Sequence, residues 1–395
     1  MKTVDSYNFS GKKALIRVDF NVPLNADFEI TDDSRMTAAL PTIQKILSDG
    51  GSVVLMSHLG RPKNGPEDKY SLKHLVSHLE KLTGVSVQFS QDCIGSEAVA
   101  ISEALAPGKI HLLENLRFHK EETAGDAAFA ALLTRHGDIY VNDAFGTAHR
   151  AHASTAVVAE SFSDKCFGYL MAKEVANATK LMDAPERPFT AIVGGAKVSD
   201  KILIIENLLN IADHIIIGGG MAYTFSVAQG GLIGDSLFEE DRVQKCADIL
   251  TQAAKKGVQI HLPADNICAN EFSNEANQQA CDSGEIPDGW MGLDIGVKAA
   301  KDFSNVLLAS RTILWNGPMG VFEMSSYENG TKSVADAVAQ STRNGAFSLI
   351  GGGDSNAAVK KFGYTNDVSY VSTGGGALLE FFEGKELPGI LAISN

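Results

Sequence analysis

Arginine recurs in the first part of the chain at points where short apolar runs end. Five arginines occupy such positions or lie close to them: Arg17, Arg35, Arg61, Arg117 and Arg150. A single exposed arginine is usually solvated, but five near successive run ends form a pattern. The planar guanidinium group is suited to bidentate binding of phosphate and carboxylate. The spacing therefore predicts a site for small anionic ligands.

Polar residues accompany two of these arginines. Asp19 and Asn21 alternate with apolar neighbours after the first run, so their side chains could point together toward a ligand hydroxyl. A turn is the alternative, because Asp and Asn also cap turns. His58 and Arg61 flank a glycine just past the second run, which favours an anion cradle.

A metal site is a weaker interpretation of the histidines. His74 and His78 stand four residues apart, but no glutamate follows His74 as in the zinc motif of metalloproteases. We therefore expect this pair on a solvated helix face. His149 and His152 lack an evident third ligand.

Apolar runs in the second part of the chain end in glycine instead. The glycine-rich turns occupy residues 194–195, 218–220, 316–320, 351–353 and 374–376. Such turns let backbone N–H groups approach a phosphate at a helix N-terminus. One turn is weak evidence, since glycine also makes tight turns, but five favour a nucleotide crevice. None matches the P-loop motif or the dinucleotide fingerprint.

Three charged residues lie beside these glycines. Lys197 and Lys201 stand four residues apart and share a face if the helix begins early. A solvated pair is the alternative, but beside the Gly-Gly turn we expect phosphate contact. Asp354 follows three glycines and is the natural carboxylate for a nucleotide-bound Mg²⁺, which takes one or two carboxylates together with phosphates.

Strand-like runs and helical patterns alternate along the whole chain, which predicts βαβ units and parallel sheets with helices on both faces. Ten or more strands are too many for one sheet, so we expect two α/β domains that join near residues 163–188. The expected strands are 14–20, 53–57, 85–89, 110–113, 139–141, 190–193, 214–217, 259–262, 312–315, 347–350 and 368–371. The expected helices of the first domain are 34–48, 71–83, 96–105 and 126–135, and a further one covers 171–182 at the join.

Length and composition narrow the class of protein. The 395 residues are 44% hydrophobic and 21% charged, as in a globular protein of two or three domains. The net charge of −14 argues against nucleic acid and anionic membranes as partners. Residues 1–165 carry 17 Lys and Arg against 21 Asp and Glu, and residues 166–395 carry 17 against 27, so the acidic surplus lies mainly in the second part.

Five scattered cysteines and an N-terminus without an apolar signal region favour reduced thiols in a cytoplasmic protein.

Eight motifs together resemble the phosphoglycerate kinase family, in order from about residue 7 to the C-terminus. They are Arg17-Val-Asp-Phe-Asn-Val-Pro23, Ser57-His-Leu-Gly-Arg-Pro62, Glu114-Asn-Leu-Arg-Phe118, Gly194-Gly-Ala-Lys-Val198, Gly218-Gly-Gly-Met221, Trp315-Asn-Gly-Pro-Met-Gly-Val-Phe-Glu323, Gly351-Gly-Gly-Asp-Ser355 and Ser372-Thr-Gly-Gly-Gly-Ala377. The length is similar to the compact bacterial form. The resemblance implies an enzyme of glycolysis and gluconeogenesis that exchanges a phosphoryl group between 1,3-bisphosphoglycerate with ADP and 3-phosphoglycerate with ATP.

By resemblance, the fold is two doubly wound α/β lobes, each a parallel sheet flanked by helices, joined by a hinge. The N-terminal lobe, residues 1–170 with a returning tail at 380–395, would bind the glycerate. The C-terminal lobe, residues 171–379, would bind the nucleotide. The resemblance further implies a cytoplasmic enzyme that we expect to be monomeric.

The resemblance also implies roles for individual residues. Those expected around the glycerate are Asp19, Asn21, Arg35, His58, Arg61, Arg117 and Arg150. Those expected around the nucleotide and its Mg²⁺ are Lys197, Lys201, Gly292, Glu323, Gly352, Gly353, Asp354 and Ser355, with Asp354 on the metal. Arg35, Lys197, Lys201 and the N–H groups of Gly374, Gly375 and Gly376 would stabilise the transferred group.

Elementary chemistry agrees with these roles. The attacking group is a carboxylate with a pKa near 3.5, which is ionised at neutral pH and needs no general base. Catalysis then consists of alignment and charge neutralisation, with hinge closure near residues 165–190. Two rivals remain: a dehydrogenase, which lacks its fingerprint here, and a two-lobed solute-binding protein, which would carry an export signal.

Overall fold

A computed structural model describes residues 1–394 of the chain, and their contacts divide the protein into two compact units. The first comprises Met1–Ala176 and the C-terminal segment from Glu386 on, and the second comprises Asn177–Lys385. None of the helices in the described chain combines the length and the apolar character that a membrane-spanning segment needs.

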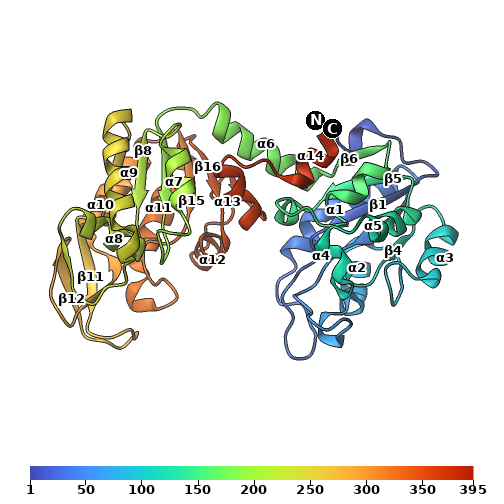
Figure 1. Ribbon diagram of the computed structural model, residues 1–395, viewed down its shortest axis with the longest axis horizontal. Helices are drawn as coiled ribbons and strands as arrows, with labels where there is room; N and C mark the ends of the chain where they lie inside the picture. Colours follow the sequence, from blue (N-terminus) through green and yellow to red (C-terminus); the bar gives the residue numbers. More distant parts are fainter. Residues whose placement is uncertain (395) are drawn as a thin grey trace. The chain divides into compact units, whose positions relative to one another are not determined.

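The first unit is built on a six-stranded sheet of order β3-β4-β2-β1-β5-β6, in which every pairing is parallel. Its strands are β1 (Lys13–Val18), β2 (Ser52–Met56), β3 (Val87–Phe89), β4 (Ile110–Leu112), β5 (Ile139–Asp143) and β6 (Lys165–Phe167). The strands are mostly apolar and buried because helices cover both faces of a parallel sheet (Figure 1). The chain order reverses beside β1, and ligands bind at the carboxyl ends of strands near such a reversal.

The helices of the first unit pack on this sheet around a core that includes Ile16, Ile43 and Leu55. They are α1 (Ser34–Ser48), α2 (Val76–Thr83), α3 (Ser96–Ala104), α4 (Lys120–Ala124), α5 (Ala127–Leu133) and α14 (Pro388–Ser394). Short 3-10 turns complete it: η1 (Val4–Ser6), η2 (Asp68–Tyr70), η3 (Leu72–Leu75), η4 (Leu116–Phe118), η5 (Thr134–His136), η6 (Phe145–Thr147) and η7 (Val157–Ser161). The expected helix at 71–83 is therefore split into η3 and α2.

Two segments connect the units in sequence. The helix α6 (Tyr169–Asp183) contains the boundary at Ala176, and its first turn is held by the carboxylate of Asp143, which accepts the Met171 N–H at 3.0 Å. At the other end of the chain, α14 returns to the first unit and contacts β6 and η7 (Figure 1). Asn142 donates to the carbonyl of Gly389 at 3.2 Å, which ties α14 to the end of β5.

The second unit repeats the plan with a parallel sheet of order β10-β8-β7-β15-β16-β17. Its strands are β7 (Phe189–Val193), β8 (His214–Ile217), β10 (Gln259–His261), β15 (Thr312–Asn316), β16 (Phe347–Ile350) and β17 (Tyr370–Val371). The helices are α7 (Ile202–Leu208), α8 (Met221–Ala228), α9 (Val243–Lys256), α10 (Val297–Ala309), α11 (Asn329–Arg343), α12 (Gly353–Lys361) and α13 (Gly376–Phe382), with η8 (Glu240–Arg242) and η9 (Ser325–Tyr327). The chain order reverses between β7 and β15, so residues after these two strands lie side by side.

The predicted fold class is confirmed, but the sequence did not reveal the second unit's smaller sheets. An antiparallel sheet of order β12-β11-β14 consists of β11 (Asp265–Ala269), β12 (Gln278–Asp282) and β14 (Met291–Ile295). A two-stranded sheet pairs β9 (Leu232–Ile233) with β13 (Glu285–Ile286). These strands are short and rich in Asp, Asn, Gln and Gly, so they lack the apolar pattern that identifies a strand in sequence.

Candidate active site

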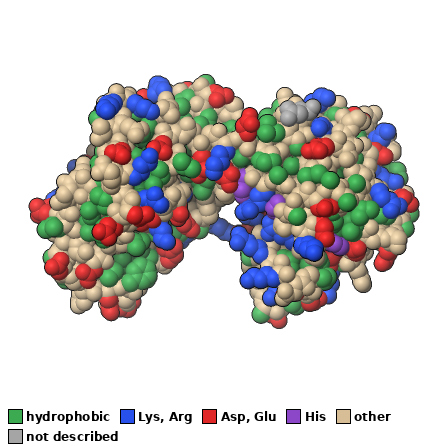
Figure 2. Space-filling view, in the orientation of Figure 1, with side chains coloured by type: hydrophobic (Ala, Val, Ile, Leu, Met, Phe, Trp, Pro, Cys, Tyr) green, Lys and Arg blue, Asp and Glu red, His purple; other side chains and the backbone are tan. Residues whose placement is uncertain are grey.

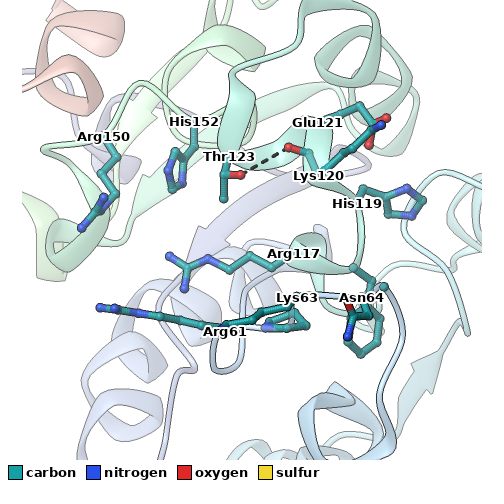
Figure 3. Close-up of a pocket in the computed structure, with 13 residues that line it drawn as sticks. Arg61, Lys63, Asn64, Arg117, His119, Lys120, Glu121, Thr123, Arg150 and His152 are labelled. Atoms are coloured by element: carbon teal, nitrogen blue, oxygen red, sulfur yellow. Dashed lines mark hydrogen bonds between the residues drawn. The ribbon is translucent and has the colours of Figure 1, made fainter.

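The first unit contains a cavity of about 890 Å³ whose wall is strongly basic. Its lining is Arg61, Pro62, Lys63, Asn64, Gly65, Arg117, Phe118, His119, Lys120, Glu121, Thr123, Arg150 and His152. Lys and Arg side chains gather with histidine on this face of the unit (Figure 2). Figure 3 shows Arg61 and Arg117 extending alongside each other toward the same part of the cavity as Arg150. The structure thus brings three of the predicted arginines together.

Arg17 does not belong to this wall, contrary to its place in the sequence pattern. Its side chain is fully buried within β1. The guanidinium donates through Nε to Ser154 Oγ at 2.9 Å and through Nη2 to His58 Nδ1 at 3.2 Å. Ser154 in turn donates to the buried carboxylate of Glu122 at 2.6 Å. Arg17 therefore supports the site from beneath rather than facing a ligand.

Asp19 and Asn21 do not line the cavity either, but hydrogen bonds connect them to it. Asp19 pairs with Arg35 at 2.9 Å, which holds the guanidinium at the start of α1. Asn21 Oδ1 accepts the N–H of Gly60 at 2.8 Å, directly before Arg61. Asp19 Oδ1 also accepts the Asn21 N–H at 3.3 Å, as in a turn, and contact of these residues with a ligand stays a prediction.

Gly60 is required by the way this turn is packed. Its φ of +64° lies in the left-handed region, and a Cβ there would stand 2.4 Å from the ring of Tyr70. The carbonyl oxygen of Gly60 accepts from Arg117 Nη1 at 2.8 Å. The turn therefore orients two arginines, one through the chain and one through a hydrogen bond.

Arg117 shows that the wall of the cavity carries uncompensated positive charge. Burial, together with the neighbouring charges of Arg17 and Arg150, lowers the pKa of Arg117 to about 10. Its Nε–H is buried and has no hydrogen-bond partner in the described structure. An anion in the cavity would relieve the repulsion between these neighbouring cations, although the buried Nε–H itself is not accessible from the cavity.

Two histidines near these arginines, His58 and His152, are neutral at neutral pH. Burial and the charge of Arg17 lower the pKa of His58 well below its ordinary value, and burial with Arg117 lowers that of His152 to about 4. A guanidinium only donates, so His58 Nδ1 accepts from Arg17 and the ring proton lies on Nε2. His58 can therefore offer a hydrogen bond, but no charge, to an anion.

The pair at His74 and His78 differs from its prediction. His74 stacks on the ring of Phe28 with centroids 4.2 Å apart and lies 2.8 Å from the carbonyl of Asp68, so it is largely covered rather than solvated. His78 Nε2 pairs with Asp33 at 2.9 Å. Both residues hold local structure, and they do not converge on a shared site.

The second unit contains a different kind of pocket, of about 550 Å³. Its wall is mostly apolar and backbone, and the predicted residues Gly292, Glu323 and Asp354 line it. The other lining residues are Gly195, Ala196, Gly219, Gly220, Tyr223, Asp235, Leu237, Phe272, Met291, Leu293, Pro318, Met319, Gly320 and Val321. Apolar side chains from 237, 272, 291 and 321 suit a flat ring system, and sequence patterning did not single them out.

Gly292 forms part of the floor of this pocket within β14, where it pairs with Cys268. A Cβ at this position would stand 1.9 Å from the hydroxyl of Tyr223. Any side chain here would displace the buried Tyr223 ring, so glycine keeps the floor flat. The N–H of Gly292 donates to Ser236 Oγ at 2.9 Å, so it is already engaged.

Several of the predicted phosphate-binding glycines serve packing instead. The N–H groups of Gly194, Gly195 and Gly219 donate to the backbone carbonyls of Asn316, Pro318 and Met319 at 2.9, 3.2 and 3.0 Å. A Cβ on Gly194 would stand 2.1 Å from the Pro318 carbonyl oxygen. Glycine at the ends of β7, β8 and β15 therefore lets three backbone turns meet, and these three N–H groups are already engaged.

The turn before α12 remains open to a ligand. Gly352 has a φ of +98°, and Gly353 begins the helix with no atom near the position of a Cβ. The first N–H groups of a helix have no partner within it, and their dipole favours an anion. Asp354 is exposed in the same first turn, while Ser355 is buried and accepts the Gly317 N–H at 2.6 Å.

The lysines do not share a helical face, because α7 begins only at Ile202. Lys201 is the residue before the helix, and its ammonium donates to Asn316 Oδ1. Burial lowers the pKa of Lys201, opposed by Asp200 and Asp354. Lys197 is exposed. Burial acts to raise the pKa of Glu239, but hydrogen bonds from Ser199 and the charge of Lys197 outweigh burial and lower this pKa. Asn316 is a site residue whose role the sequence did not show.

The turn at Gly374, Gly375 and Gly376 precedes the short helix α13. Gly375 has a φ of +50°, with nothing within 4 Å of its Cβ position. Gly374 donates to Ser372 Oγ at 3.0 Å. A helix of seven residues has a weak dipole, so this turn offers local N–H groups rather than a long-range field.

Comparison with known proteins identifies the family. A family model described as phosphoglycerate kinase matches residues 4–385. A curated relative named phosphoglycerate kinase from Porphyromonas gingivalis is 52% identical over 418 residues, covering 100% of both chains. One of the same name from Chloroherpeton thalassium is 51% identical over 394 residues, covering 100% of this chain and 99% of the relative.

Solved structures agree with these relatives. The structure of phosphoglycerate kinase from Coxiella burnetii superposes with a TM-score of 0.90 at 40% identity, covering 99% of this chain and 98% of that one. The enzyme from Pyrococcus horikoshii gives a TM-score of 0.84 at 32% identity, covering 100% and 98%. The chain therefore belongs to the phosphoglycerate kinase family.

Proposed function

We propose that this chain catalyses reversible, Mg²⁺-dependent phosphoryl transfer between 1,3-bisphosphoglycerate with ADP and 3-phosphoglycerate with ATP. Family membership over the whole chain supports this function. The observation that carries it is the pair of dissimilar pockets, one walled by Arg61, Arg117 and Arg150 and one lined by apolar residues and glycine. The first suits a small polyanion, and the second suits a nucleoside with phosphates at its edge.

In the first unit, we assign the glycerate to the basic cavity. Arg61, Arg117 and Arg150 would hold its anionic groups, which would relieve the repulsion between these neighbouring cations. Asp19 and Asn21 would meet the hydroxy-acid end, and His58 would donate from Nε2. Arg35, held by Asp19, would reach the group in transfer.

In the second unit, we assign the nucleoside to the pocket over Gly292, with Glu323 on the ribose hydroxyls. The N–H groups at Gly352 and Gly353 and the ammonium of Lys201 would contact the phosphates. Ser355 would act indirectly, because it holds the turn at Gly317. Lys197, which is exposed, would have to turn from Glu239 toward the phosphates.

The residues present fit a nucleotide-bound Mg²⁺. Asp354 is an exposed carboxylate that lines the pocket at the phosphate-binding turn. Mg²⁺ is usually held by one or two carboxylates, phosphate oxygens and water. When bound, the ion neutralises charge on the phosphate oxygens.

No residue needs to act as a general base in this reaction. The carboxylate of 3-phosphoglycerate is ionised at neutral pH and attacks the terminal phosphorus of ATP, while the bond to the bridging oxygen breaks and ADP leaves with its electron pair. Arg35, Lys201 and the N–H groups at Gly374, Gly375 and Gly376 would stabilise charge on the transferred group.

Direct in-line transfer needs groups from both units on one phosphoryl group, so we propose that the units close during turnover, with hinges in α6 and before α14. X-ray scattering with both substrates, with either one and with neither tests this. Compaction should appear only with both bound. An unchanged radius of gyration in the ternary complex would contradict it. We also expect a cytoplasmic monomer, which light scattering after size exclusion tests for its oligomeric part.

A coupled assay tests the function itself. ATP formation from 1,3-bisphosphoglycerate and ADP should require Mg²⁺ and stop with excess chelator. The reverse reaction should consume 3-phosphoglycerate and ATP. Neither direction proceeding with pure, folded protein would refute the proposal.

A further inference from the structure

A cluster of three potential metal ligands lies beside the basic cavity, outside the residues assigned to the reaction. Asp92, Cys93 and His119 each offer one ligand atom, and these atoms lie within 4.8 Å of one another. They are a carboxylate oxygen, a thiol sulfur and an imidazole nitrogen. We propose that this trio is a site for a thiophilic divalent transition metal ion such as Zn²⁺.

Two segments of the first unit bring the trio together. Asp92 and Cys93 lie in the loop between β3 and α3, and His119 lies directly after η4. His119 Nε2 and Asp92 Oδ1 are 2.7 Å apart, and the same oxygen accepts the Cys93 N–H at 2.7 Å. The loop is thus folded so that the carboxylate, the thiol and the imidazole meet.

The geometry needs little change to hold an ion. Tetrahedral Zn²⁺ with bonds of about 2.0–2.3 Å to O, N and S separates its ligand atoms by roughly 3.3–3.6 Å. The Asp92–His119 contact would therefore open by well under 1 Å, with the ion replacing the shared proton. The side chains of His119 and Asp92 are 29% and 43% exposed, so they can move and the ion can enter between them.

The third ligand is rigid and lies beneath the other two. Cys93 is fully buried, and its carbonyl oxygen lies 2.9 Å from His136 Nε2, which therefore carries a proton. His136 Nδ1 is in turn 2.7 Å from Ser102 Oγ. Such supports behind a ligand fix its position and strengthen metal binding.

The Asp92 carboxylate lies directly beside the thiol residue, since its Oδ1 accepts the Cys93 N–H. An ion bound here would displace the thiol proton to solvent, as metal binding to cysteine does.

The ligand types distinguish this site from the one expected for Mg²⁺. Sulfur and nitrogen ligands select zinc-like ions, whereas Mg²⁺ prefers oxygen. Three protein ligands leave a fourth position for water. His119 also lines the basic cavity and stands two residues after Arg117, so an ion would brace the segment that carries this arginine (Figure 3).

Cobalt spectroscopy tests the site directly. The metal-free, full-length protein is titrated with Co²⁺, which should give a thiolate-to-cobalt charge-transfer band and the visible bands of a tetrahedral ion at one equivalent. Zn²⁺ should displace it. Cys93→Ser should abolish the charge-transfer band, and His119→Gln should weaken binding by at least roughly tenfold. Circular dichroism confirms that each variant is folded; His119→Gln alters a partly exposed side chain and keeps the test valid if Cys93→Ser unfolds.

Cys166→Ser is the matched control, because Cys166 is a second fully buried thiol of the same unit. It should leave the spectrum and affinity unchanged. The proposal is overturned if wild type gives no thiolate band, if Cys166→Ser removes it, or if His119→Gln binds as tightly as wild type. In that case the Asp92–His119 contact is an ion pair that holds the loop.

Discussion

The two units present opposite solutions to binding a phosphorylated ligand. The first unit lines its cavity with guanidinium groups, to the point that Arg117 has a lowered pKa and an unpaired buried N–H. The second unit lines its pocket with glycine and apolar side chains and buries a single lysine, Lys201, behind it. The cavity of the first unit therefore has a strong positive field even without a ligand, whereas the pocket of the second unit offers backbone N–H groups at the start of a helix.

The contrast shows why net charge says little about such ligands. The units are both acidic overall, yet Arg61, Arg117 and Arg150 gather in one cavity of the first unit. It also implies different weaknesses. The first site shares its positive charge among several arginines, whereas the second depends on one lysine, Lys201, and on backbone N–H groups.

The largest effect is expected for the one buried cation of the glycine-lined site. Lys201→Ala should lower kcat by roughly 10²–10³, the cost typical of losing one group that stabilises charge in the transition state. Steady-state kinetics with saturating substrates measures this. Lys298→Ala, which removes an exposed ion pair with Asp282, is the control and should keep wild-type kcat. Near-normal turnover of Lys201→Ala would mean that backbone groups alone suffice.

In the basic site, Arg35→Ala should lower kcat by a comparable or somewhat smaller factor, roughly 10². The reason is that Arg35 is 36% exposed and other arginines remain in the unit. Thermal stability should fall only modestly, because Arg35 is partly exposed and the Asp19 carboxylate still accepts the Asn21 N–H. Arg343→Ala, which breaks an exposed pair with Asp367, serves as control. A large loss of stability with normal kcat would reassign Arg35 to a structural role.

Backbone recognition in the second unit can be tested at Gly353. Proline at the first position of a helix is well tolerated but has no N–H. Gly353→Pro should therefore weaken ADP binding by about tenfold or more relative to Gly353→Ala, since a hydrogen bond to a charged group contributes about 1.5–3 kcal/mol. Isothermal titration calorimetry compares the two variants. Equal affinities would show that this N–H does not contact the phosphates.

The smallest effect concerns one buried carboxyl in each unit. Burial raises the pKa of Asp143 and of Asp294 to about 7, and each side chain accepts an N–H near a helix start. An unfolded aspartate has a pKa of about 3.9, so the folded state binds more protons between about pH 4 and pH 7. Their contribution to the free energy of unfolding is therefore present below pH 4 and declines as pH rises toward 7.

Urea unfolding between pH 5 and pH 8 measures this decline. Asp143→Asn and Asp294→Asn cannot ionise, so each should fall less steeply than wild type. The two variants should differ from wild type by similar amounts, because burial raises both pKa values to about 7. Parallel pH profiles for wild type and both variants would contradict the raised pKa values.

Much of the fold could be predicted from local pattern. The helix α1 and the strands β8 and β16 begin and end where expected, because each combines a clear apolar period with flanking polar or glycine residues. The antiparallel strands β11, β12 and β14 could not, because their stability comes from pairing across the sheet rather than from their own composition. The division of the chain at residues 170 and 380 into a glycerate-binding lobe and a nucleotide-binding lobe stays a prediction.

The sequence by itself determined the family, the α/β class and the residue types of both sites, because eight ordered motifs and their spacing are properties of the chain. Only the tertiary structure decided how those residues are used. Arg17 turned inward because β1 is central to its sheet, and the glycines after β7 and β15 meet one another because the chain order reverses there. The hydrogen-bond partners of these polar groups lie far away in the chain, so local sequence pattern cannot identify them.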